Sequence, residues 1–186
     1  NYIGMHLNTS KTKKKAMHSM MLTGLEIELY SSLFSFFFFS FDLMQNYLIE
    51  HLTSKDNKQA YEFSKKIISN SEDWYEYFDV FVSLLNHENS LVRNRTMSIL
   101  AAIVEFDDEN KFDDILDDFL SHINDKKAIT SRQCIKYLAI VGTNRPRYNP
   151  QILNSLEMAD LSKYSENMRH LIEKDIKKTQ KILSSI

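Results

Sequence analysis

Histidine is the residue type in this chain best suited to acid–base or metal chemistry near neutral pH, and the sequence holds six. No two of them lie three or four positions apart, the spacing that would place two rings on one face of a helix. His87 and His122 both fall near predicted helix turns and could share one rim of the molecule, although surface histidines are the commoner explanation. No HExxH or CxxC motif is present, so we expect neither a metal site nor any other cofactor.

Nucleophiles and nucleotide-binding loops are equally sparse. The single cysteine, Cys134, lies on an apolar helical face, where a small core residue is the expected role. One cysteine also excludes an internal disulfide, in keeping with a cytoplasmic location. Three glycines leave no room for the GxxxxGK[ST], GxGxxG or GxSxG loops that hold phosphates or a catalytic serine. The sequence therefore predicts a protein that is not an enzyme.

The strongest charge feature is the acidic segment 107–118. Asp113 and Asp117 are four residues apart, as are Asp114 and Asp118, so like charges gather on one exposed helix face. Such a face could dock a basic partner or hold a divalent cation weakly. A solvated outer face, with carboxylates at the favourable end of the helix dipole, explains the same pattern without a function.

The elements that would position these residues are helices. Three glycines and two prolines are too few for a sheet protein with many turns, so we expect an all-α chain. Ser54 or Asp56 is expected to cap one helix, and Ser90 another. Gly142 is expected to stop the helix that contains Cys134. Helical apolar spacing is clearest at Phe112, Ile115, Leu116, Phe119, Leu120 and Ile123.

A unit of two helices joined by a polar turn recurs at an interval of 38 positions. The turn residue Asn86 falls on Asn124 in this register. A helical unit that recurs at a fixed interval is typical of a solenoid, in which each repeat packs on its neighbours. The shift also places apolar residues on apolar residues: Phe78 on Leu116, Phe81 on Phe119, Val82 on Leu120, Leu85 on Ile123, Leu91 on Ile129, Met97 on Ile135 and Leu100 on Leu138.

The stretch from Leu84-Leu85-Asn86 through Val92-Arg93 to Leu100 resembles a HEAT repeat, with apolar residues ending the first helix, an amide in the turn and Val-Arg entering the second helix. Residues 44–186 are also similar to a group of small bacterial HEAT-repeat proteins of unassigned activity, in the segments NKFDDILDDFLSHI, TSRQCIKYL and DLSKYSENMRHLIEKDI. The resemblance implies a short right-handed α-α superhelix, an armadillo-like solenoid of roughly four helical hairpins.

The family places polar contacts between successive repeats, formed by the turn acid and the arginine. By resemblance, Asn86 and Arg93 take these places in one unit, and Asn124 and Arg132 in the next. Asn replaces the more usual Asp, and the second unit lacks the Val-Arg pair. The second helices line the inner face in the family, so Arg93, Arg95 and Arg132 are the candidate partner-binding residues.

The function implied is a non-enzymatic protein- or peptide-binding scaffold whose partner is acidic or phosphorylated. A nucleic-acid-binding or DNA-repair module is the alternative, because some HEAT-like solenoids hold phosphates with arginines. Residues 44–186 nevertheless hold 19 of the 23 basic residues and 22 of the 25 acidic ones. A groove that tracks phosphates usually needs a basic excess, so we expect no nucleic-acid partner.

Residues 1–43 form an N-terminal extension that matches nothing downstream, with a basic run followed by a phenylalanine tract at 33–41. One interpretation is a signal peptide or membrane anchor, although the apolar run is shorter than the roughly 20 residues of a spanning helix. A second is an amphipathic helix that caps the end of a solenoid. The third is that the natural protein starts at Met44 and that the preceding residues have no selected fold.

Overall fold

The computed structural model describes residues 41–186, and every regular element in this range is a helix. The prediction of an all-α fold is confirmed for these residues. The predictions for the N-terminal extension fall almost entirely on residues 1–40, outside the described range. Between residues 41 and 186, no helix combines the length and the apolar character that crossing a membrane requires. The chain divides into the units Asn1–Met44 and Gln45–Ile186, and the second is described here by itself.

Short connections join the helices of the second unit, some of them 3-10 turns. Helical residues 45–53 precede α3 in this unit. The α-helices are α3 (Asn57–Ser69), α4 (Phe78–Leu85), α5 (Ser90–Ile103), α6 (Phe112–Ser121), α7 (Ala128–Asn144), α8 (Asn149–Glu157) and α9 (Glu166–Leu183). The 3-10 turns are η1 (Ser71–Tyr77), η2 (Val104–Phe106), η3 (His122–Asn124) and η4 (Pro146–Tyr148).

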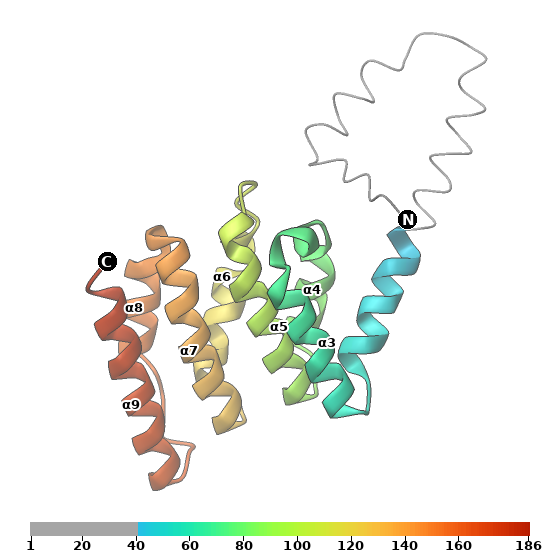
Figure 1. Ribbon diagram of the computed structural model, residues 1–186. Helices are drawn as coiled ribbons and strands as arrows, with labels where there is room; N and C mark the ends of the chain where they lie inside the picture. Colours follow the sequence, from blue (N-terminus) through green and yellow to red (C-terminus); the bar gives the residue numbers. More distant parts are fainter. Residues whose placement is uncertain (1–40) are drawn as a thin grey trace, which may run out of the picture. The chain divides into compact units, whose positions relative to one another are not determined.

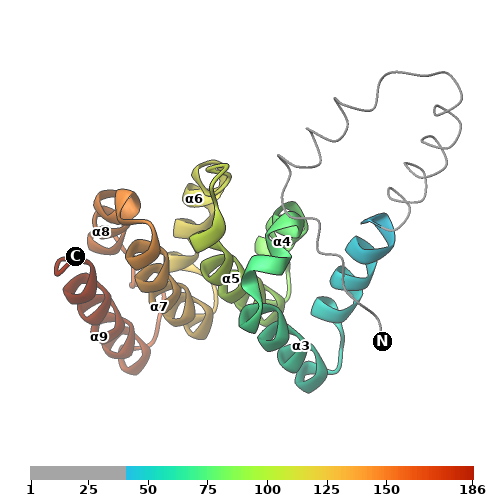
Figure 2. The same ribbon diagram turned by 45° about the horizontal axis from the view of Figure 1, so that its top comes forward.

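These helices are arranged in two layers. α3, α5, α7 and α9 form one layer, in which each helix packs against the next (Figure 1). α4, α6 and α8 form the other layer, and the view turned by 45° shows the same order (Figure 2). Successive helices run in opposite directions, so the members of the first layer run parallel to one another.

The core lies between the two layers and includes the predicted apolar series of α6 and η3. Every member of that series, from Phe112 to Ile123, is buried, and the rings of Phe112 and Phe119 lie 5.5 Å apart. Burial of each such side chain stabilises the fold by roughly 1.5–3 kcal/mol. Cys134 is a free thiol that is fully buried in the same core, as expected.

The N-cap residues of α3 and α5 can be compared with the predicted ones. Asp56 caps α3, because its carboxylate accepts hydrogen bonds from the amides of Lys58 (3.0 Å) and Gln59 (3.1 Å). The predicted cap Ser90 is wrong by one residue. Asn89 has the extended backbone of a cap, and its side chain accepts from the Leu91 amide at 2.9 Å.

Asp107 stabilises the start of α6, where the acidic segment places a carboxylate, through direct hydrogen bonds to its free amides. The carboxylate is buried, and it accepts hydrogen bonds from the amides of Lys111 (2.9 Å) and Phe112 (2.9 Å) and from the Tyr75 hydroxyl (2.6 Å). Asp107 therefore satisfies the free amides at the start of α6 and joins that start to η1. Burial, together with the hydrogen bond to Asp107, raises the pKa of the Tyr75 hydroxyl.

Gly142 does not end its helix, since α7 continues to Asn144. The residue is buried, and a Cβ added there would lie 2.3 Å from Oδ1 of Asn149 and 2.6 Å from Cδ2 of Leu183. The prediction of a helix stop is wrong. The side chains of Asn149 on α8 and Leu183 on α9 fill the space that a Cβ would occupy, so a larger residue at this position has to displace them.

Candidate interaction surface

Arg93, a predicted partner contact, is buried against the turn of the following hairpin. Its Nε and Nη2 donate to the two carboxylate oxygens of Asp125, each at 2.8 Å, and both side chains are only 4% exposed. Its Nη1 donates to the backbone carbonyls of His87 (2.7 Å) and Glu88 (2.9 Å). Four of the five N–H donors of this guanidinium have internal acceptors, and the side chain is buried, so the predicted role of Arg93 in partner binding has to be corrected to an internal one.

Arg95 is likewise an internal residue and not a partner contact. It is buried on α5, and its Nη1 donates to the carbonyl of Leu52 while its Nη2 donates to Oδ1 of Asn57 at 2.8 Å. Burial lowers the pKa of the guanidinium. Arg95 thus joins α5 both to the end of the helix that precedes α3 and to the start of α3. The Leu52 carbonyl is free to accept because carbonyls in the last turn of a helix have no N–H donor within that helix.

Arg132 is the one predicted contact that keeps partial access to solvent. Its Nε lies 2.6 Å from Oδ2 of Asp175 on α9, and its side chain is 26% exposed. The pair fixes α9 beside α7. Arg132 can add to a surface charge, but Asp175 already neutralises much of it.

The predicted ladder residues Asn86 and Asn124 are both exposed. Asn124 does join successive hairpins, since its Oδ1 accepts from the Asp160 amide at 2.9 Å and its carbonyl accepts from the Lys163 ammonium. The contact with the arginine, however, is made by Asp125, one residue beyond the predicted position. The ladder assignment is corrected accordingly. The available sequence signal is charge: Asp125 can neutralise Arg93, and Asn124 cannot.

His122 completes the buried cluster around Asp125. Its Nδ1 lies 3.2 Å from Oδ2 of Asp125, the residue is 6% exposed, and its Nε2 has no hydrogen-bond partner among the described residues. Burial lowers the pKa of His122, despite the opposing effect of the nearby carboxylate. Burial alone would raise the pKa of Asp125, but the hydrogen bonds from Arg93, the Lys127 amide and His122 lower it overall.

A shallow hollow of about 280 Å³ lies over this cluster, and it brings His87 and His122 to one rim. A histidine–aspartate pair acts as a general base when its free ring nitrogen meets a substrate. Here that nitrogen is buried, and Arg93 already neutralises Asp125. Within residues 41–186, no three histidine, cysteine or acidic side chains are grouped so that they could hold a metal ion. The cluster therefore joins hairpins and has no arrangement for catalysis.

The acidic face of α6 is partly used by the next hairpin. Asp113 accepts hydrogen bonds from Nη2 of Arg147 (2.7 Å) and from the Tyr148 hydroxyl (2.6 Å). Asp117 accepts from Nε2 of Gln151 at 2.6 Å. These contacts hold α8 against α6. Of the two acidic pairs on α6, the pair Asp113 and Asp117 therefore has a structural role.

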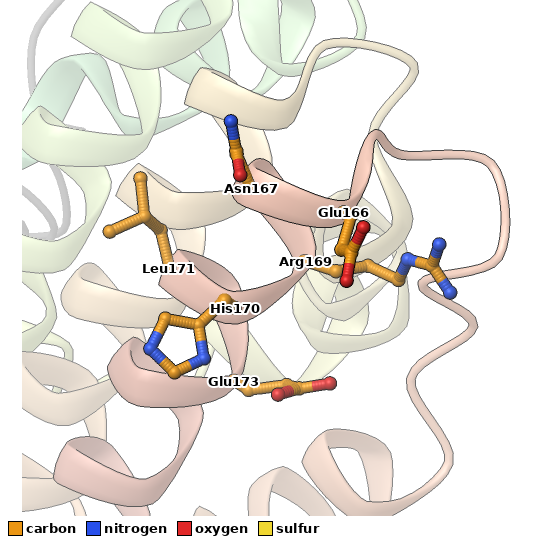
Figure 3. Close-up of a pocket in the computed structure, with 6 residues that line it drawn as sticks. All are labelled: Glu166, Asn167, Arg169, His170, Leu171 and Glu173. Atoms are coloured by element: carbon orange, nitrogen blue, oxygen red, sulfur yellow. The ribbon is translucent and has the colours of Figure 1, made fainter.

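A second hollow, of about 640 Å³, lies along α9 and is shown in Figure 3. All the residues that line it come from that one helix, and their side chains fan out from it. Leu171 and Arg169 point to opposite sides of α9 (Figure 3). No set of polar groups converges there on a common point, so the hollow has no features of a small-molecule site.

Exposed apolar side chains distinguish the two layers. In the part of the chain that the structure describes, α4, α6 and α8 carry no large hydrophobic residue that is exposed. The layer of α3, α5, α7 and α9 carries several, at Tyr61, Leu91, Ile129, Ile140, Leu171 and Ile182. We call the solvent-facing side of this layer the apolar face. Large exposed apolar side chains that gather on one side mark an interaction site more often than scattered ones do.

No protein-family model matches this sequence, and no curated protein or solved structure matches it significantly.

Proposed function

We propose that this chain is a protein-binding scaffold of HEAT-repeat type, a short right-handed superhelix without catalytic activity of its own. The observation that carries the proposal is the asymmetry between the layers, because α3, α5, α7 and α9 expose large hydrophobic side chains within their bounds whereas α4, α6 and α8 expose none. Met158, which is 76% exposed, follows the last residue of α8. A stack of parallel helices offers a long and rigid surface, which is suited to a peptide or protein and poorly suited to a small molecule.

The spacing of the hairpins supports the HEAT-type part of the proposal. α5 begins at Ser90 and α7 at Ala128, and this interval equals the 38-residue period of the sequence. The contact between Arg93 and Asp125 joins one hairpin to the next, which is the role that the resemblance assigns to a turn acid and an arginine.

The burial of two reactive side chains, Cys134 and His122, supports the non-enzymatic part. Within the described residues, Cys134 is fully buried, and burial raises the pKa of its thiol. The histidine that contacts a carboxylate, His122, has no exposed ring nitrogen that could reach a substrate. The nucleic-acid alternative loses two of its candidate contacts, since Arg93 and Arg95 bind internal acceptors.

Affinity capture with the full chain tests the proposal. The tagged protein is compared with a variant of the apolar face, Ile129→Ser with Ile140→Ser, and with a variant of the opposite layer, Asp114→Ser with Asp118→Ser. All four positions are exposed, so both variants should keep their fold, and a thermal melt verifies this. We expect captured proteins to fall by about fivefold or more only in the first variant. Equal capture by all three proteins would refute the proposal.

A further inference from the structure

Two neighbouring helices of the apolar face carry the same pattern of exposed side chains. Each stripe has an apolar residue, two basic residues and a second apolar residue, at spacings that keep all four on one side of a helix. We call these the α7 stripe and the α9 stripe. The α7 stripe is Ile129, Arg132, Lys136 and Ile140, and the α9 stripe is Leu171, Lys174, Lys178 and Ile182.

The two stripes lie side by side at the same level. Arg132 contacts Asp175 at 2.6 Å, and the Thr179 hydroxyl donates to the carbonyl of Ile135 at 3.0 Å. From the first contact to the second, the residue number rises on both helices, from 132 to 135 on α7 and from 175 to 179 on α9, so α7 and α9 run parallel. A residue of α7 is therefore level with the residue 43 or 44 positions later, and each stripe member has its counterpart within about two residues of that register.

Three of the four basic side chains in the middle of the two stripes have no carboxylate partner among the described residues. Arg132 is paired with Asp175, but Lys136, Lys174 and Lys178 are exposed and form no ion pair with any described carboxylate. The corresponding positions on α5 are Leu91, Asn94, Ser98 and Ala102, which repeat the apolar start of the stripe without its charge. At these aligned positions, the basic pair thus occurs on α7 and α9 and not on α5, while α3 carries Lys65 with its Nζ 5.5 Å from the centroid of the Tyr61 ring.

We infer that the α7 and α9 stripes bind an acidic amphipathic helix of a partner protein, an inference that rests on the proposed scaffold function. The carboxylates of the partner lie over Lys136, Lys174 and Lys178. Its apolar side chains cover Ile129 with Leu171 at one end, and Ile140 with Ile182 at the other. These ends are about 16 Å apart along the helix axis, the rise of roughly three helical turns, so one short helical segment spans both.

A nucleic-acid strand fits the same surface less well. Phosphates would meet the lysines, but the apolar ends of both stripes would have no apolar partner, and exposed hydrophobic area favours protein over phosphate backbone. The acidic balance of residues 44–186 also repels a polyanion at longer range.

The test uses the full chain and a synthetic helical peptide of about 16 residues, with leucine at each end of one stripe and glutamates between them. A matched peptide carries glutamine in place of each glutamate. Binding is measured by fluorescence anisotropy. Two charge-reversal variants are compared with the native chain. One changes the stripes, Lys136→Glu with Lys174→Glu and Lys178→Glu, and the control makes an equal change of charge outside α7 and α9, Lys55→Glu with Lys66→Glu and Lys126→Glu.

We expect the affinities of the glutamate peptide for the native chain and for the control variant to agree within about threefold. Its affinity for the stripe variant should be at least about tenfold lower, because each exposed charge pair contributes a factor of roughly two to five. Binding should also weaken as salt rises. The inference is refuted if neither peptide binds, if the glutamine peptide binds equally well, if the stripe variant keeps its affinity, or if single-stranded DNA binds the same lysines more tightly. Capture that depends on Ile129 and Ile140 but not on these lysines would refute the inference while leaving the scaffold function standing.

Discussion

Replacement of Asp125 by asparagine is the sharpest test of how the hairpins are held together. The carboxylate accepts two hydrogen bonds from Arg93 and one from the Lys127 amide, and it contacts His122. Asparagine keeps the volume and can still accept from the amide, but it leaves the Arg93 charge without a counter-ion in a site that is 4% exposed. Removing one partner of a buried ion pair costs about 3–5 kcal/mol.

The carbonyls of His87 and Glu88 still bind Nη1 of Arg93, so we expect Asp125→Asn to cost near the lower end, at about 3 kcal/mol. For a chain of this size that loss lowers the melting temperature by roughly 6–12 °C. Urea unfolding followed by circular dichroism gives the free energy of unfolding, and an unchanged denaturant slope shows that the native state is still compact.

Asp114→Asn is the matched control, since Asp114 is exposed on the outer side of α6, and its cost should stay within about 0.5 kcal/mol. A double-mutant cycle with Arg93→Met then isolates the pair. If Asp125→Asn costs no more than the control, or if the cycle shows no coupling between positions 93 and 125, the account of the hairpin junction is wrong.

Three further predictions follow from buried positions. Gly142→Ala should destabilise the chain by about 1–3 kcal/mol in thermal melts, because its methyl group would press on Leu183; a neutral effect would contradict the close packing of α7 and α9. The folded-state pKa of His122 is lowered, so the unfolded state binds the extra proton; the stability from this residue is present above the ordinary histidine value and is lost as pH falls below it. Urea midpoints between pH 8 and pH 5 should therefore fall more in the native chain than in His122→Gln, and parallel curves would refute the assignment. Cys134 should stay unmodified by a thiol reagent until urea unfolds the chain, since it is fully buried; rapid labelling of the native protein would contradict its place in the core.

Local pattern predicted the helices well because helical periodicity and caps act over a few neighbouring residues. The apolar series of α6 is buried as predicted, and Asp56 caps α3. The cap of α5 was missed by one residue, because serine and asparagine have nearly equal cap preference and only backbone geometry separates Asn89 from Ser90.

The candidate site was harder to predict, since its residues depend on partners far along the chain. Arg93 looks like a surface charge until Asp125, 32 positions later, is placed against it. The ladder prediction chose Asn124 by its position in the repeat, whereas the buried charge of Arg93 requires the neighbouring carboxylate. The apolar and basic stripes of α7 and α9 were both present in the sequence, but the level at which the two helices align depends on contacts such as that of Arg132 with Asp175, 43 positions later.

The sequence by itself determined that this chain is helical and where most of its helices lie, because these properties follow from local spacing and from few glycines and prolines. It also gave the 38-residue interval between the starts of α5 and α7. Only the tertiary structure decided which charges are buried and which remain on the surface. The physical reason is that the cost of burying a charge depends on the counter-ion beside it, and Arg93 and Arg132 find theirs 32 and 43 positions away.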